Sequence, residues 1–268
     1  MAQLKFQKYQ GAGNDFVIFQ GNVFENLSAS QIENFIKNLC HRRFGVGADG
    51  VITILEAPSP QIFEMGFYNS DGLPGSFCGN GARCAARFAI DHGMTSPDEP
   101  FSFSFADNTY LARPEMNDQI GIKFANVGKP AEVEDMFFVD TGSPHIVIEN
   151  LVNDKNALRK KALEIRHSDR FAEKGVNVNF TERGRNGEWN LVTFERGVED
   201  FTWACGTGAV GTAIYLMTQK GEENPYLLRS PGGLLTVELG NGAKNTFDPI
   251  WLSGPASSIF EGSVDGPD

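Results

Sequence analysis

Two cysteines in this 268-residue chain open the same short phrase. Residues 78–82 read Cys-Gly-Asn-Gly-Ala, and residues 205–209, 127 positions later, read Cys-Gly-Thr-Gly-Ala. Apolar residues at helical spacing follow each phrase, so each thiol is expected just before the start of a helix. The unpaired N–H groups and the positive end of the helix dipole at that point favour a thiolate. Two such thiols indicate a pair of acid/base groups that act on one substrate.

A pair of thiols suits the inversion of a stereocentre, because one group removes a proton from one face while the other supplies a proton to the opposite face. The α-hydrogen of an amino acid is only weakly acidic. Without an electron-sink cofactor, the carbanion must therefore be stabilised electrostatically. Gly79 and Asn80 after the first cysteine, and Gly206 and Thr207 after the second, offer backbone N–H groups to a carboxylate.

The elements that must position these thiols repeat in the same order. A capping box at residues 30–33 predicts a helix, and Asn153-Asp154 is expected to cap a second helix about 126 residues later. Strand-like segments follow at residues 50–54 and 177–180. An ordered series at a nearly constant offset predicts two copies of one domain.

Short alternating segments broken by turn residues make up most of the remaining chain. They lie at residues 101–105, 121–124, 137–140, 146–149, 189–195 and 234–239. Many short strands and few helices predict an α+β fold of two pseudo-symmetric domains, each an antiparallel sheet wrapped around a central helix. We expect residues 1–127 with 256–268 to form the half that carries Cys78, and residues 128–255 to form the half that carries Cys205.

The composition excludes several classes of partner. A net charge of −11 opposes binding to nucleic acid. No apolar run approaches the roughly 18 residues that span a membrane, and the N-terminus reads as a strand, so a cytoplasmic protein is expected. The four cysteines read as free thiols, and the four histidines lack metal-ligand spacing, so no metal is expected.

Six motifs together resemble those of the diaminopimelate epimerase family. They are Gly-Ala-Gly-Asn-Asp-Phe at 11–16, Asn-Ser-Asp-Gly at 69–72, the two cysteine phrases, Pro-His at 144–145 and Glu-Arg-Gly at 195–197. The resemblance covers about residues 3–264. It implies a cofactor-independent epimerase that interconverts LL-2,6-diaminopimelate and meso-diaminopimelate for lysine and peptidoglycan precursors. It also implies an active site in the cleft between the two domains, and it leaves a homodimer possible.

The resemblance also implies the roles of individual residues. The expected catalytic residues are Cys78, Cys205, His145 and Glu195. The expected substrate-binding residues are Asn14, Asn69, Gly79, Asn80, Ser143, Asn177, Glu195, Arg196, Gly206 and Thr207. In one direction Cys78 donates a proton and Cys205 abstracts one. Arg196 is expected to hold the distal carboxylate through its guanidinium fork, and Glu195 to pair with the distal ammonium.

Three features depart from the family pattern and bear on the substrate more than on the reaction. Ser143 stands where many relatives have asparagine, Gly50 stands where some have glutamine, and the segment 198–203 is one residue longer than usual. A racemase acting on proline, hydroxyproline or histidine is one alternative, although such ligands would leave Glu195 and Arg196 unpaired. A non-catalytic amino-acid-binding module is another, although both cysteines are present.

Overall fold

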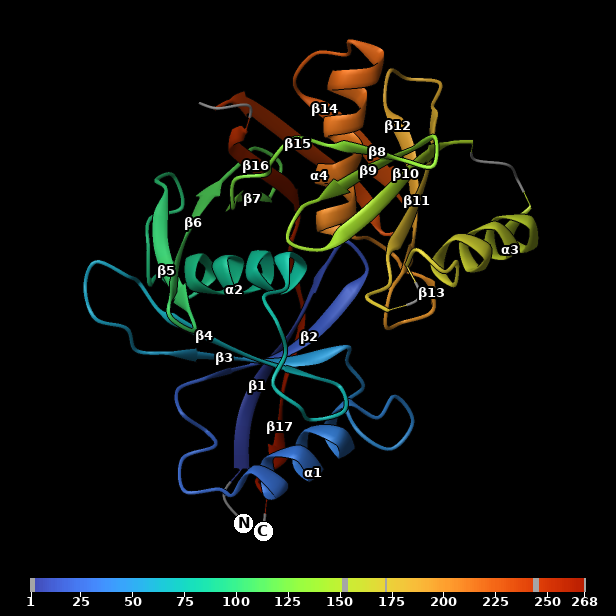
Figure 1. The fold of residues 1–268 in the computed structure, drawn as a ribbon. Coiled ribbons are helices and arrows are strands. Elements are labelled where there is room, and N and C mark those ends of the chain that lie inside the picture. Colours follow the sequence, from blue (N-terminus) through green and yellow to red (C-terminus); the bar gives the residue numbers. More distant parts are fainter. Residues whose placement is uncertain (1–2, 151–153, 172, 243–245, 268) are drawn as a thin grey trace. The chain divides into compact units, whose positions relative to one another are not determined.

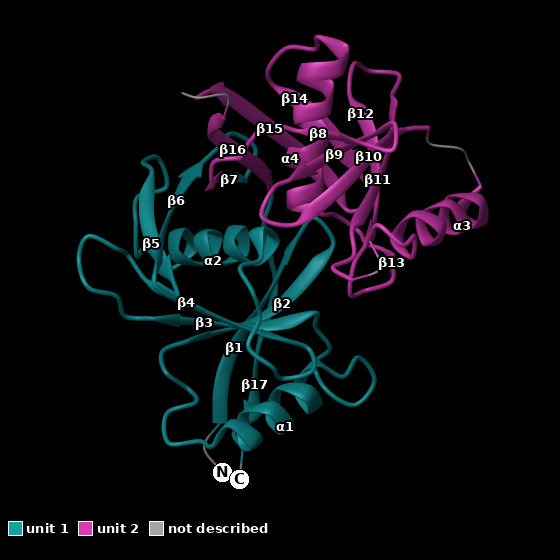
Figure 2. Ribbon diagram, viewed as in Figure 1, with its two compact units in different colours: residues 1–122, 255–268 teal, residues 123–254 magenta. Residues whose placement is uncertain are grey.

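The computed structural model describes residues 3–150, 154–171, 173–242 and 246–267. The chain divides into two compact units (Figure 2). Unit 1 comprises Met1–Ile122 and Pro255–Asp268, and unit 2 comprises Lys123–Gly254. The division into two epimerase halves at the boundaries expected from the sequence stays a prediction.

Unit 1 is built from short strands and two helices among its described residues (Figure 1). The helices are α1 (Ala29–Cys40) and α2 (Gly79–Asp91). The strands are β1 (Gln3–Gly11), β2 (Asn14–Gln20), β3 (Gly50–Leu55), β4 (Glu64–Asn69), β5 (Phe101–Phe105), β6 (Asn108–Pro114), β17 (Ser257–Asp265) and β7 (Gln119–Phe124), whose last two residues belong to unit 2. Because β17 pairs antiparallel with β1, the last strand of the chain completes the sheet that the first strand begins.

Unit 2 has the same kind of composition. Its helices are α3 (Lys155–Arg166) and α4 (Gly206–Tyr215), and a π-helical turn, Leu216–Lys220, extends α4. Its strands are β8 (Ala131–Val133), β9 (Met136–Asp140), β10 (Pro144–Glu149), β11 (Asn177–Arg183), β12 (Trp189–Glu195), β13 (Asp200–Phe201), β14 (Tyr226–Ser230), β15 (Gly233–Asn241) and β16 (Phe247–Pro255).

The duplicated plan appears directly in the strand pairing. In unit 1 the successive pairs β1–β2, β2–β3, β3–β4, β4–β5 and β5–β6 alternate between antiparallel and parallel. In unit 2 the pairs β9–β10, β10–β11, β11–β12, β12–β14 and β14–β15 alternate in the same order. The two units therefore share one topology, and the expected α+β class is confirmed.

The expectation of antiparallel sheets is wrong in detail, because the strands of both units pair in parallel as well as antiparallel. Each parallel pair is joined through a helix: α1 lies between β2 and β3, α2 between β4 and β5, α3 between β10 and β11, and α4 between β12 and β14. Parallel neighbours need a long crossover connection, and a helix provides one. The helices that carry the thiols are thus crossover helices as well as core helices.

The expected capping box at residues 30–33 is also wrong, because α1 begins two residues earlier. Ser28 is the N-cap, and its Oγ accepts a hydrogen bond from the Gln31 backbone N–H at 3.4 Å. The Gln31 side chain accepts one in return from the Ser28 N–H at 3.0 Å. The capping box is therefore Ser28-x-x-Gln31, two residues before the expected Ser30-x-x-Glu33. In unit 2, Asp154 caps α3 as expected, while Asn153 lies outside the described residues.

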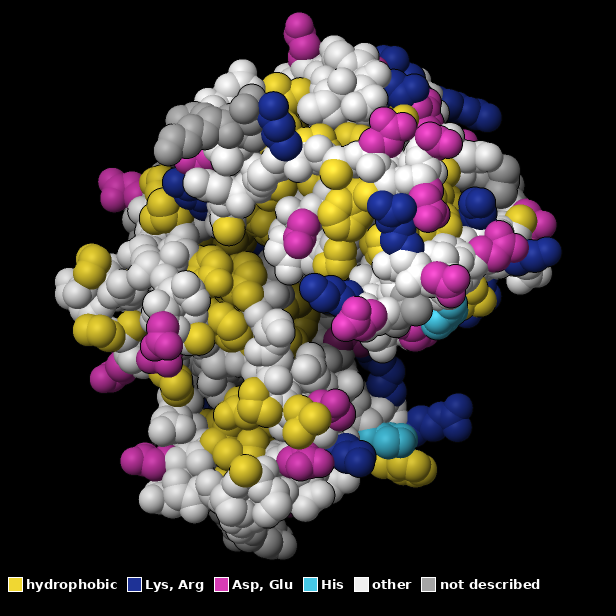
Figure 3. All heavy atoms as spheres, in the orientation of Figure 1, with side chains coloured by type: hydrophobic (Ala, Val, Ile, Leu, Met, Phe, Trp, Pro, Cys, Tyr) yellow, Lys and Arg dark blue, Asp and Glu magenta, His cyan; other side chains and the backbone are white. Residues whose placement is uncertain are grey.

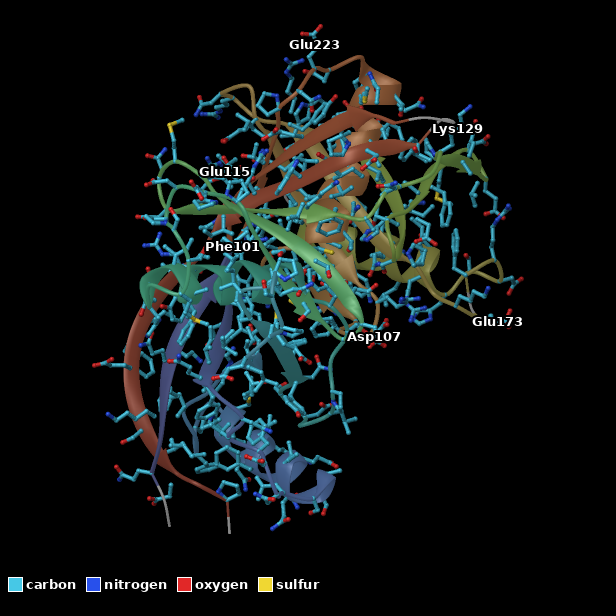
Figure 4. All side chains as sticks on the ribbon, turned by 90° about the vertical axis from the view of Figure 1, so that its left-hand side faces the viewer. Phe101, Asp107, Glu115, Lys129, Glu173 and Glu223 are labelled. Atoms are coloured by element: carbon cyan, nitrogen blue, oxygen red, sulfur yellow. The ribbon has the colours of Figure 1, made fainter. Side chains whose placement is uncertain are left out.

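Unit 1 encloses α2 as its central helix. Nine of the thirteen residues of α2 are buried, and its apolar side chains share one cluster with residues from β1 to β7. Phe101, labelled in Figure 4, begins β5 and belongs to that cluster. The opposite face of the sheet packs against α1, because Val17 and Phe19 point toward α1 while Phe16 and Ile18 point toward α2. This alternation follows from the two-residue period of a strand.

The helix α4 has the corresponding place in unit 2. Its residues from Gly208 to Ile214 are all buried, and it contacts β9, β10, β11 and β15. Helix α3 covers a separate cluster that contains Leu158, Val178 and Phe180. Among the described residues, no helix has both the length and the apolar character needed to cross a membrane. Figure 3 shows charged side chains of both signs mixed over the face in view.

A buried ion pair fixes the base of the β1–β2 hairpin. The Lys8 ammonium lies 2.8 Å from the Asp15 carboxylate, with only 4% of the Lys8 side chain exposed, and it also donates to the Gly47 carbonyl. Arg42 donates to the other Asp15 oxygen at 2.6 Å. Burial alone would raise the pKa of Asp15, but the hydrogen bonds from Arg42 and Lys8 lower it to about 2.

We expect this pair to make stability depend on pH at the acid end. The folded-state pKa of Asp15 lies below its unfolded value of about 3.9, so its contribution is complete above that value and is lost as pH falls through about 2. Asp15→Asn should lower the free energy of unfolding by about 3 kcal/mol at pH 7, since it leaves the Lys8 ammonium uncompensated. Urea unfolding of Asp15→Asn at pH 7 and at pH 3 checks this, with Asp91→Asn as the control variant. The prediction is contradicted if the two variants lose the same free energy of unfolding at both pH values.

Candidate active site

Cys78 is the N-cap of α2, as the sequence predicts. Its backbone is extended, with φ −113° and ψ 112°, and its Sγ accepts a hydrogen bond from the Gly81 N–H at 3.4 Å. The side chain is half-buried beside the cluster around α2. A sulfur in this position faces the unpaired N–H groups of the first helical turn, which stabilise negative charge.

Cys205 is the N-cap of α4 in nearly the same conformation. Its φ and ψ are −123° and 112°, and its Sγ accepts from the Gly208 N–H at 3.4 Å. Gly81 and Gly208 are related by the same offset of 127 residues as the two cysteines. The local geometry of the two thiols is therefore repeated as closely as the sequence phrase.

Next to Cys78, a chain of side-chain hydrogen bonds fixes two amides that the sequence assigns to substrate binding. Asn14 donates to Asp49 at 3.0 Å, Asn80 donates to Asn14 at 2.5 Å, and Arg83 donates to Asn80 at 2.7 Å. A carboxylate can only accept and a guanidinium can only donate, so the orientation of both amides follows from the two ends of the chain. The structure thus brings Asn14, Gly79 and Asn80 together with Cys78.

The tight β1–β2 turn places Asn14 against α2. Ala12 and Gly13 both have positive φ, 53° and 90°, as a two-residue hairpin turn requires. A Cβ at Gly11 would lie 2.9 Å from the Asn80 carbonyl oxygen, so glycine allows the strand to approach the first turn of the helix. Asn69 ends β4 in an exposed position, and its backbone N–H donates to Leu73 at 2.9 Å.

Beside Cys205, hydrogen bonds connect the thiol to His145 through Thr207. Cys205 Sγ lies 3.3 Å from Thr207 Oγ1, which lies 3.0 Å from His145 Nε2. His145 is completely buried, and burial lowers its pKa to about 4, with Arg196 acting in the same direction. The imidazole is therefore neutral near pH 7.

Asn179 determines which nitrogen of His145 carries the proton. Asn179 Nδ2 donates to the Gly208 carbonyl at 3.2 Å, so its Oδ1 faces His145 Nδ1 at 3.3 Å. That oxygen also accepts from Thr193 at 2.9 Å. Nδ1 must then be the protonated nitrogen, and Nε2 is an acceptor for the Thr207 hydroxyl. Thr207 can accept the Cys205 S–H in turn, which gives a continuous path from sulfur to imidazole.

Ser143 and the backbone of Arg196 join this group through Asn177, whose Nδ2 lies 3.4 Å from His145 Nε2. Asn177 Nδ2 donates to Ser143 Oγ at 2.7 Å, and Asn177 Oδ1 accepts from the Arg196 backbone N–H at 2.8 Å. The Arg196 side chain is exposed and donates to the Lys174 carbonyl at 2.8 Å. Glu195 ends β12, and burial raises the pKa of its carboxyl, an effect that the Thr202 hydroxyl reduces.

The sequence of the chain matches a known protein family. A family model described as diaminopimelate epimerase matches residues 6–109 and 137–257 of the chain. The chain belongs to the diaminopimelate epimerase family. A relative named diaminopimelate epimerase, from Flavobacterium psychrophilum, is 37% identical over 264 residues, which cover 97% of this chain and 100% of the relative.

Solved structures of proteins outside the diaminopimelate epimerase family have the same fold as this chain. A phenazine biosynthesis protein of the PhzF family from Bacillus anthracis has a TM-score of 0.73 at 12% identity, covering 99% of this chain and 100% of that one. A hydroxyproline epimerase from Agrobacterium vitis, with bound trans-4-hydroxy-L-proline, has a TM-score of 0.68 at 15% identity, covering 99% and 93%. At these identities the likeness concerns the fold alone.

Two departures from the diaminopimelate epimerase pattern have a structural explanation. A Cβ at Gly50 would lie 2.6 Å from the Tyr68 carbonyl oxygen and 2.7 Å from the Phe67 ring, so β3 and β4 leave no space for a longer side chain there. The Ser143 hydroxyl holds the Asn177 amide, and Gly142 before it has φ +89°, which favours glycine. In this member of the family, Ser143 therefore orients Asn177, another residue that is predicted to bind the substrate.

The supporting residues of both half-sites were not among those predicted from the sequence. Asn179 and Thr193 are buried, face each other across β11 and β12, and fix the tautomer of His145. Asn179 lies two residues after Asn177, on the same side of its strand, and these polar residues alternate with the apolar Val178 and Phe180. Asp49 and Arg83 were not predicted either, although Arg83 directly follows the first cysteine phrase.

Proposed function

We propose that this chain is an isomerase that interconverts LL-2,6-diaminopimelate and meso-diaminopimelate. One observation carries the proposal: a chain of the diaminopimelate epimerase family has a cysteine as the N-cap of each of its two crossover core helices. In the proposed reaction, one sulfur is a thiolate and the other a thiol. The thiolate removes the α-proton, and the thiol supplies a proton to the opposite face of the same carbon.

Electrostatic stabilisation of the carbanion is the second part of the proposed mechanism. As the C–H bond breaks, its electron pair moves into the α-carboxylate, which gains enolate character. The backbone N–H groups at Gly79 and Asn80, and those at Gly206 and Thr207, are the proposed donors to that carboxylate. Fixed donors of this kind need no reorganisation when the charge develops. The protein can therefore stabilise the carbanion without an electron-sink cofactor.

His145 is proposed to hold the Cys205 thiol in place through Thr207. Its neutral Nε2 accepts a hydrogen bond from the Thr207 hydroxyl at 3.0 Å, and the Thr207 oxygen lies 3.3 Å from Cys205 Sγ, where it can accept the S–H. In the family assignment Cys205 abstracts and Cys78 donates for one direction of the reaction.

The distal half of the substrate is proposed to lie against the polar residues around Arg196. The guanidinium pairs with the distal carboxylate, and Glu195 pairs with the distal ammonium. The amides of Asn14, Asn69 and Asn177 can serve either group, since each offers donors and an acceptor. Ser143 acts here through Asn177, whose amide it holds at 2.7 Å.

The cellular setting follows from the proposed reaction. Its product would enter the synthesis of lysine and peptidoglycan precursors in the cytoplasm, with no cofactor required. A small-molecule substrate is the proposed partner, and a homodimer stays a prediction.

A panel of amino acids in deuterated water tests the proposal. LL-diaminopimelate, lysine, proline, hydroxyproline and histidine are each incubated with the enzyme, and inversion and mass are followed together. We expect inversion of diaminopimelate alone, with one deuterium at the inverted α-carbon. Lysine is the matched control, because it lacks only the distal carboxylate. Faster inversion of proline or histidine, or inversion of diaminopimelate without label, would overturn the assignment.

A further inference from the structure

Arg83 is a completely buried cation in the second turn of α2, the helix that Cys78 begins. None of its side chain is exposed, and it is the largest of the fully buried side chains. Its guanidinium donates to Asn80 Oδ1 at 2.7 Å and, at 3.5 Å each, to the Gly79 and Pro255 carbonyls. All three acceptors are neutral, so none of them balances the charge.

No carboxylate among the described residues forms an ion pair with Arg83. The nearby acids Asp15 and Asp49 are already paired with Lys8 and Arg42. A buried charge without an opposite charge is costly, so the position calls for an anion. Burial lowers the pKa of Arg83, and the two groups that act against this are the thiols of Cys84 and Cys78.

Only one of these two thiols is suited to carry the negative charge. Cys84 is completely buried in the apolar cluster around α2, and burial raises its pKa far above the ordinary value despite the nearby Arg83. Cys84 therefore stays a neutral thiol. Cys78 is half-buried and accepts a backbone N–H at the start of the helix, where a thiolate is stabilised.

The second half-site has no such cation at the equivalent position. The offset of 127 residues that relates Cys78 to Cys205 relates Arg83 to Val210, which is buried and apolar. Among the described residues, Thr207 Oγ1 lies 3.3 Å from Cys205 Sγ, and the neutral His145 lies beyond Thr207. The two central helices therefore differ in charge at one equivalent buried position, which is arginine in α2 and valine in α4.

We propose that Arg83 is a positioning residue that holds Asn80 and Asn14 in place and provides the counter-charge of a Cys78 thiolate. The free enzyme then rests with Cys78 as the base and Cys205 as the acid. In the first turnover, the Cys78 thiolate forms an S–H bond with the α-proton while the Cys205 S–H bond breaks to protonate the opposite face. The assignment of Cys78 as base and Cys205 as acid rests on the proposed two-thiol reaction. The difference in charge between the two half-sites does not depend on that reaction.

The pH dependence of alkylation by iodoacetamide measures the two thiolates separately. The modified peptides of Cys78 and Cys205 are quantified by mass spectrometry, and a midpoint is read for each thiol. In the unmodified enzyme we expect the Cys78 midpoint to lie below that of Cys205 by about one pH unit or more. An equal or higher midpoint for Cys78 would overturn the proposal without any variant, and whatever the substrate proves to be.

Substitution of Arg83 provides the second arm. Arg83→Met keeps the length and removes the charge, so it should raise the Cys78 midpoint by about one unit or more and leave the Cys205 midpoint unchanged. Arg83→Lys keeps the charge and loses the fork that binds Asn80, so it should keep the low midpoint while weakening substrate binding. Arg87→Met is the matched control on the same helix, where the arginine is paired with Asp91 and Asp118. A folded Arg83→Met enzyme with an unchanged Cys78 midpoint would overturn the counter-charge role.

Discussion

Replacing either cap cysteine by serine is expected to lower kcat/KM for diaminopimelate by about 10³-fold or more, which is the scale of a lost general acid or base. A serine hydroxyl is a far weaker acid than a thiol, so it can neither hold the negative charge nor match its partner. The fold should survive, because serine is a favoured N-cap and can accept from the same Gly81 or Gly208 N–H.

The two serine variants should also differ from each other in a way that a loss of folding cannot imitate. Cys205→Ser keeps the Cys78 thiolate, so it should exchange the α-hydrogen of only one isomer with deuterated water and return that isomer unchanged. Cys78→Ser should exchange only the other isomer. Cys40→Ala is a suitable control, because Cys40 ends α1 in a separate buried cluster. Near-normal inversion in either serine variant, or the same preferred isomer in both, would refute the two-base scheme.

The repeated features of this fold could be predicted from the sequence because they are local. A cysteine followed by glycine and then a helical apolar pattern predicts the start of a helix, and both Cys78 and Cys205 are N-caps. The strands Phe101–Phe105 and Trp189–Glu195 have the bounds that their alternation predicts. Their pairing direction depends on the connections between them, and the helical crossovers make four of the neighbouring pairs parallel.

The charges and tautomers of the site could not be predicted in the same way, because they depend on contacts between distant segments. Arg83 reads as an ordinary helix residue until its burial is known, and Asn179 reads as a strand residue until its bonds to His145 and Gly208 are known. The Gly50 departure likewise has its reason in the Phe67 ring on the neighbouring strand. Identity and spacing thus predict which groups react, while packing determines their charge.

Alanine at Gly208 is expected to lower activity much more than alanine at Gly81, although the two glycines are equivalent by sequence. A Cβ at Gly208 would lie 2.8 Å from Asn179 Oδ1, 2.9 Å from Thr193 Oγ1 and 3.3 Å from Cys205 Sγ. The added methyl group must displace the amide that holds the His145 proton on Nδ1. Displacements near 1 Å at a reacting group can cost about 10²-fold in rate, and we expect a loss between about tenfold and that value.

The same methyl group at Gly81 meets only ordinary contacts. Its nearest neighbours would be the ends of the Ile52 and Met65 side chains, each at 3.4 Å. Since alanine is a better helix former than glycine by about 1 kcal/mol, Gly81→Ala should keep nearly full activity with an equal or higher Tm. Steady-state kinetics and thermal unfolding of both variants decide the matter. Only Gly208→Ala should disturb the hydrogen bonds that connect Cys205 through Thr207 to His145. Equal losses of activity in the two variants would therefore mean that these hydrogen bonds are not needed.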